Sequence, residues 1–157
     1  MSFRPNTVIP MTLNEFILAI NGASGASEKG IAIFEKELGA KLPADYRNFL
    51  LKCNGGACGG AVIFKRSGPT VHHVFGLRAK LSLSWYLKIV RKGEGPPVPE
   101  DLFPIMDNPG GYPICMAWKG KACGTVYAWT PRAMKRLAPS FTDFIKGLRE
   151  VPEDDDE

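Results

Sequence analysis

Residues 37–56 read ELGAKLPADYRNFLLKCNGG, and this stretch decides the fold. Pro43 suits the first turn of a helix, because the amide that proline lacks has no partner there. The apolar residues within 46–53 recur at helical spacing and predict one buried face. Asn and Gly tolerate the left-handed backbone of a helix C-cap, so residues 54–56 are expected to end this helix. The glycine-rich run continues to Gly60, and strand signals begin only after it.

Two further helices are expected before this stretch. Residues 13–20 carry apolar side chains at helical spacing, and the Asn21-Gly22 pair is expected to end that helix. Ser27 is a suitable N-cap for a second helix, because its hydroxyl can accept a free amide of the first turn. The apolar stripe within residues 31–38 gives this second helix a buried face, and Gly39 is expected to end it.

After this stretch the pattern alternates between strands and helices. Four short strands are expected at residues 61–65, 71–77, 114–118 and 125–129. Residues 83–90 fit a helix, with a strand as the alternative, and Ser140 is expected to cap a last helix. Strands in consecutive pairs, separated from helices, predict an α+β fold rather than a parallel βαβ sheet. We expect a single domain with a mainly antiparallel sheet packed against several helices.

Charge is distributed unevenly along the chain. Six of the 16 acids lie in residues 150–157, which we expect to be a disordered acidic tail outside a domain of residues 1–149. That domain carries 20 bases and 10 acids, and nine of the bases lie between Asp45 and Glu94, where there is no acid. Such a body is expected to attract an acidic protein face or a polyanion. The alternative is a set of separately solvated bases, and the tail is either free or folded back on them.

No stretch suggests export or membrane insertion. The apolar run at residues 13–20 is too short and too polar for a signal peptide. No run approaches the roughly 18 apolar residues that a membrane span needs. We therefore expect a cytoplasmic protein with no membrane contact.

The titratable residues do not form a recognisable catalytic or metal motif. The spacing of Cys53 and Cys58 barely fits a zinc ligand pair and that of Cys115 and Cys123 does not, so we expect reduced, mostly buried thiols, with zinc or a disulfide as the alternatives. The adjacent His72 and His73 point to opposite faces of an expected strand. Asp107, beside Asn108-Pro109-Gly110, is interpreted as a turn residue. We expect no enzymatic activity, no metal and no cofactor.

The pattern ELG–LPxDYRxFL–NGG within residues 37–56 resembles the N-terminal signature of the SUKH superfamily, of the Smi/Knr type. Three further pieces follow in the order of that family. They are VFGL at 74–77, LFPI at 102–105 with Asp107 and Gly110-Gly111, and GTVYAW at 124–129 with APSFTDF at 138–144. Together the pieces cover about residues 27–149. The chain departs from the family pattern at Gly110-Gly111 and at Thr130-Pro131-Arg132, two expected loops near the partner-facing side.

The resemblance implies an α+β fold with a sheet packed on helices and no catalytic site. Bacterial members are commonly immunity proteins that bind and neutralise a toxin, and fungal relatives regulate cell-wall synthesis. The resemblance therefore predicts a protein-binding module whose partner is a toxin domain. A basic nucleic-acid-binding module and a cell-wall or signalling scaffold are the alternatives.

Aromatic side chains and arginine dominate binding hot spots, so we sought them outside the expected core. The candidate partner-binding residues are Tyr112, Trp85, Arg132, Lys135 and Arg136. Tyr112 lies in a Gly/Pro loop, and the three bases follow the last expected strand, where they form either a patch or separately solvated loop charges. Tyr127 and Trp129 share one face of that strand and are expected in the core.

Overall fold

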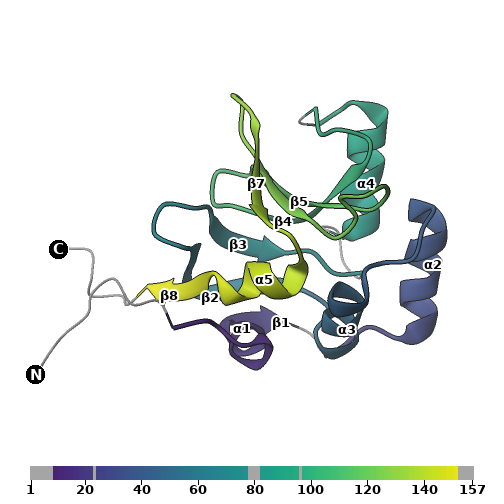
Figure 1. The fold of residues 1–157 in the computed structure, drawn as a ribbon. Helices are drawn as coiled ribbons and strands as arrows, with labels where there is room; N and C mark the ends of the chain where they lie inside the picture. Colours follow the sequence, from purple (N-terminus) through teal and green to yellow (C-terminus); the bar gives the residue numbers. More distant parts are fainter. Residues whose placement is uncertain (1–8, 23, 78–81, 96, 152–157) are drawn as a thin grey trace, which may run out of the picture.

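The computed structural model describes residues 9–22, 24–77, 82–95 and 97–151 (Figure 1). The helices in these residues are α1 (Leu13–Ala19), α2 (Glu28–Leu38), α3 (Ala44–Lys52), α4 (Leu83–Lys92) and α5 (Phe141–Lys146). The strands are β1 (Ile20–Gly22), β2 (Gly56–Phe64), β3 (Thr70–Val74), β4 (Leu102–Asp107), β5 (Pro113–Ala117), β6 (Val126–Trp129), β7 (Met134–Ala138) and β8 (Leu148–Val151). The expected single-domain α+β fold is confirmed. None of the described helices is long and apolar enough to cross a membrane.

All the strands belong to one antiparallel sheet. Its order is β1-β2-β3-β4-β5-β6-β7, and β8 adds to β2. Strand β1 pairs with residues 56–58 of β2, while β8 pairs with residues 61–64 on the same side. The two therefore lie end to end along one edge of β2. Strand β7 forms the other end of the sheet and pairs with β6.

The main core lies between one face of the sheet and the five described helices, and it includes Leu83 and Leu87 of α4. Tyr46 of α3 is at its centre, with ring centroids 5.0 Å from Phe141 of α5 and 6.2 Å from Phe103 of β4. A smaller cluster lies on the opposite face and includes Leu102, Cys115 and Ala117. Both faces of β4 and β5 are therefore buried, which fits their continuous apolar sequences.

Helix boundaries follow the caps in most places. Ser27 accepts the amide of Gly30 at the start of α2, and Gly39 ends that helix with a φ of 101°. Residues 83–92 are helical, so the strand alternative for this segment is wrong. Ser140 caps α5 by accepting the amide of Asp143. The helix is preferred for 83–92 because its apolar residues recur at helical spacing and Ser82 supplies the cap.

Two expected helix ends are shifted. Helix α1 ends at Ala19, and residues 20–22 pair with β2 as a strand. Helix α3 ends at Lys52, its C-cap Cys53 has an extended backbone, and the left-handed residue is Gly55, with a φ of 77°. Gly55 is therefore not the C-cap. A Cβ at this residue would lie 2.5 Å from the carbonyl oxygen of Val74 and 2.6 Å from the amide of Gly76, so the close passage of two backbones requires glycine.

The glycine-rich run at residues 56–60 is part of β2 rather than a loop. The first residues of the run pair with β1 on one side and with β3 on the other. The pairing with β3 shifts register between Ala57 and Val62, and glycine suits such an irregular strand because it adopts conformations that other residues avoid. The expected start of this strand at Ala61 is therefore five residues late, because pairing on both sides overrides the weak strand propensity of glycine.

Strands β4 and β7, like β1 and β8, were not expected from the sequence. Strand β4 contains Pro104 in its middle, a residue that usually argues against an interior strand. A register shift between Pro104 and Met106 accommodates the missing donor. Strand β7 contains Lys135 and Arg136, so these bases are not loop residues. Bases are common on an edge strand, because they discourage unwanted pairing.

Strand β8 extends beyond Arg149, into the segment expected to be the acidic tail. Strand β8 includes Glu150 and Val151, which pair with Val62 and Ala61 of β2. These two residues, which we assigned to the acidic tail, are ordered by the sheet. The rest of the tail, residues 152–157, lies outside the described residues, as do Arg78 and Lys80 of the basic stretch.

Candidate protein-binding site

The first exposed aromatic group lies on α4. Trp85 is 44% exposed, and its ring stands perpendicular to that of Tyr86 with centroids 4.8 Å apart. Tyr86 in turn stacks on the buried Phe75, with centroids 3.9 Å apart and an interplanar angle of 10°. The N-cap Ser82 accepts the amide of Trp85 and fixes the start of the helix. Trp85 is therefore exposed on a rigid aromatic support.

Asp107 lies at the end of β4 beside two histidines. Its Oδ1 accepts the amide of His73 at 3.1 Å and lies 3.5 Å from Nδ1 of His72. Burial raises the pKa of this carboxyl, and the two histidines oppose that rise. The turn is made instead by Asn108, whose Oδ1 accepts the amides of Gly110 and Tyr112. The interpretation of Asp107 as a turn residue is therefore wrong.

The second exposed aromatic group lies on the β5–β7 side of the sheet. Tyr112 is 40% exposed and meets Trp129 of β6 edge-on, with centroids 5.4 Å apart. Trp129 is paired in register with Met134 of β7. Trp129 is half-buried beside the smaller cluster, so the expectation that it is a core residue holds only in part.

Register identifies which side chains share this face. Paired residues point to the same side of a sheet, and side chains alternate along each strand. Tyr127 pairs with Cys115 of the smaller cluster and with Arg136 of β7. We call the resulting set the Tyr112 face, and it consists of Tyr112, Tyr127, Trp129, Met134 and Arg136.

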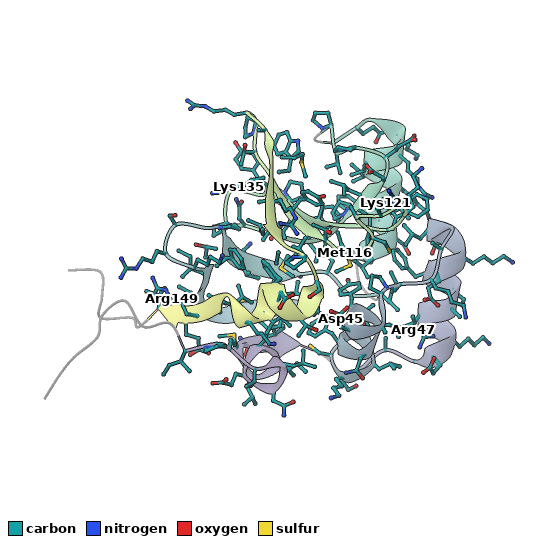
Figure 2. The ribbon with its side chains drawn as sticks, viewed as in Figure 1. Asp45, Arg47, Met116, Lys121, Lys135 and Arg149 are labelled. Carbon is teal, nitrogen blue, oxygen red and sulfur yellow. The ribbon has the colours of Figure 1, made fainter. Side chains whose placement is uncertain are left out.

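The structure separates the five candidate residues. Tyr112 and Arg136 belong to the Tyr112 face, and Arg132 lies in the β6–β7 turn that borders it. Lys135 is paired with Ala128 and so extends from the opposite face of β7 (Figure 2). Trp85 lies apart from them on α4. Met134 was missed because β7 was not expected, although apolar residues at 134 and 137 flank its bases.

The signature residues of α2 and α3 are used for internal contacts. Glu35 accepts the amide of Leu42 at 2.8 Å and lies 3.4 Å from Nε of Arg47, which also pairs with Glu28 at 2.7 Å. Asp45 accepts both the amide and the hydroxyl of Thr142 at 2.9 Å, and so joins α3 to the start of α5 (Figure 2). These polar groups therefore connect α2, α3 and α5 within the chain.

The cysteines are free thiols, two of them buried. Burial raises the pKa of Cys58 to about 11 and that of the fully buried Cys115 further, so both are protonated at neutral pH. A protonated thiol is a poor nucleophile and a poor metal ligand. Within the part of the chain that the structure describes, no three His, Cys, Asp or Glu side chains gather to hold a metal ion.

Comparison with known proteins identifies a family. No curated protein matches the chain at a significant level. The family model described as the SMI1/KNR4 family (SUKH-1) matches residues 25–147, which include α2 to α5 and strands β2 to β7. The match covers most of the chain and includes the signature, and the α+β fold agrees with it. The chain therefore belongs to the SMI1/KNR4 family (SUKH-1).

Proposed function

We propose that this chain is a non-enzymatic immunity protein that binds a cognate toxin domain through the Tyr112 face and blocks it. Membership of the SUKH-1 family supports a module of the immunity or cell-wall-regulator type, and the family is generally non-catalytic. The observation that carries the proposal is the half-exposed pair of Tyr112 and Trp129, which lies on the same face as the exposed Arg136.

The pair is suited to be an anchor because it is already ordered. The Asn108 side chain holds the backbone of Tyr112, and Trp129 supports its ring. Binding therefore immobilises little additional side chain, which reduces the entropy lost on association. Aromatic residues of this kind, with a neighbouring arginine, supply most of the binding energy in typical interfaces.

The charge of the molecule favours an acidic partner face. The domain carries twice as many bases as acids, and Arg132 and Arg136 border the aromatic pair. Opposite charge on the partner would accelerate encounter and select against basic proteins.

The test is co-purification with the product of the adjacent gene, followed by measurement of Kd for single variants. Tyr112→Ala and Arg136→Ala are each expected to weaken binding at least about tenfold, since each removes an anchor. Lys135→Ala is the matched control for Arg136→Ala, because it removes the neighbouring base from the opposite face. Ile33→Ala, on the exposed side of α2, is the control for loss of apolar surface.

Two results would contradict the proposal. One is the absence of binding to any large secreted protein encoded next to the gene. The other is an equal loss of affinity in Lys135→Ala and Arg136→Ala, which would place the contact elsewhere. A nucleic-acid-binding module would instead give a gel shift whose affinity falls steeply with salt, because each neutralised phosphate releases a counterion.

A further inference from the structure

We infer that the partner engages β7 by strand addition, through an extended acidic segment that pairs with the free edge of this strand. The inference rests on the proposed function, since it concerns how a protein partner is held. It names a backbone contact and a partner chemistry that the Tyr112 face alone does not specify.

The edge is available for pairing. Strand β7 stands at the end of the sheet order and pairs with β6 among the described strands. Lys135 and Arg136 are exposed, so neither side chain is covered by another element of the described chain. An edge of this kind presents unpaired amides and carbonyls, and a partner segment can satisfy them.

The hairpin hydrogen bonds indicate which backbone groups are free. The amide of Thr130 donates to the carbonyl of Ala133 at 3.0 Å, so these two residues form a hydrogen-bonded pair. Hydrogen-bonded and non-hydrogen-bonded pairs alternate along an antiparallel ladder. Lys135 therefore bonds to β6, whereas the amides and carbonyls of Met134 and Arg136 point outward. Two outward residues at this spacing are what an added strand requires.

An added strand would extend the Tyr112 face. Met134 and Arg136 have their side chains on that face, in register with Trp129 and Tyr127. Every second side chain of the incoming segment would therefore lie next to Met134 or Arg136. The register shift between Val126 and Tyr127 comes just beyond Arg136, so regular pairing is confined to the first half of β7.

Charge selects the sequence of the segment. Residues 108–142 contain five bases and no acid, and three of these bases lie in or next to β7. Two copies of this chain would place like charges opposite each other if their β7 strands paired, which is unfavourable. An acidic segment from another protein would face Arg136, on the Tyr112 face, with opposite charge.

The first test uses capped peptides of alternating valine and glutamate and measures amide hydrogen exchange by NMR. With saturating peptide, the amides of Met134 and Arg136 are expected to exchange about tenfold more slowly, because newly formed hydrogen bonds protect them. The amide of Lys135, already bonded to β6, is the internal control. A valine–lysine peptide and an N-methylated valine–glutamate peptide are expected to have no effect. Unchanged exchange at Met134 and Arg136 would overturn the inference.

The second test compares Arg136→Ala with Arg136→Pro in the complex obtained by co-purification. Both variants lack the side chain, but proline also removes the outward amide, so it is expected to bind at least about tenfold more weakly than alanine. Thermal melting checks that both are folded. Equal affinities with intact toxin binding would refute strand addition and leave the proposed function in place. Slower exchange with the peptide, together with the absence of any toxin partner, would refute the proposed function and leave strand addition in place.

Discussion

The signature helices α2 and α3 and the Tyr112 face differ in how their functional groups are used. In the helices, the charged groups of Glu35, Asp45 and Arg47 have partners within the chain. On the Tyr112 face, the aromatic rings contact each other but remain partly exposed, and the neighbouring Arg136 points to solvent. The N-terminal signature in α2 and α3 is therefore used for internal contacts, whereas the surface that we propose for a partner lies on strands β5–β7, which include the later GTVYAW piece of the family pattern.

The largest effect should come from Gly55, in the Asn-Gly-Gly run at the end of the signature. Gly55→Ala is expected to lower the free energy of unfolding by about 3 kcal/mol or more, because its φ is 77° and a Cβ would collide with the backbone of residues 74–76. Gly111→Ala is the control. Gly111 has a φ of 82° but no atom within 4 Å of its added Cβ, so only about 1 kcal/mol should be lost. Urea denaturation measures the free energy of unfolding of both variants. Equal losses would show that the left-handed backbone conformation, and not the close approach of residues 74–76, accounts for the cost of the added Cβ.

A smaller loss is expected when the link between α3 and α5 is cut. Asp45→Ala leaves the amide and hydroxyl of Thr142 without an acceptor and should cost about 1–2 kcal/mol. Asp45→Asn keeps one oxygen acceptor and should lose less. If Arg136→Ala on the Tyr112 face destabilised the protein as much as Asp45→Ala, the contrast between the two regions would fail.

Truncation within and just after strand β8 tests where the folded domain ends. A chain that stops at Arg149 loses two of the four register pairs with β2 and is expected to lose about 1 kcal/mol of stability. A chain that stops at Val151 keeps all four pairs and is expected to melt at the temperature of the full chain, because residues 152–157 contain five acids and no large apolar side chain. A large loss of stability in the chain that stops at Val151 would mean that the acids of residues 152–157 make fixed contacts with the basic body.

Helices were easier to predict from this sequence than strands, for physical reasons. Caps such as Ser27 and Ser140 act within one turn of the chain, so local sequence is enough to find them. Strands depend on partners far along the chain. Pro104 in β4 and the glycines of β2 contradict local propensity, and pairing with neighbouring strands overrides it.

The candidate site was predictable only where local sequence exposes a residue. Tyr112 follows a Pro-Gly-Gly turn, and its exposure follows from that turn. The grouping of Arg136 with Trp129, and the separation of Lys135 from both, depend on the register of β6 and β7. Register is set by the hairpin and the buried face together, so no spacing in the sequence reveals it.

The smallest effect is expected at the centre of the signature, where one polar atom is an exception to the rule of internal partners. The hydroxyl of Tyr46 is fully buried, and no group in the described residues bonds to it. Burial raises the pKa of this phenol well above its usual range, so it stays neutral. A buried hydroxyl without a partner lowers stability, so Tyr46→Phe should leave the free energy of unfolding unchanged or raise it by up to about 1 kcal/mol. Tyr127→Phe, on the half-exposed face, is the control and should have no effect. Urea denaturation measures both variants, and a loss above about 1 kcal/mol in Tyr46→Phe would mean that a buried water bonds to the hydroxyl.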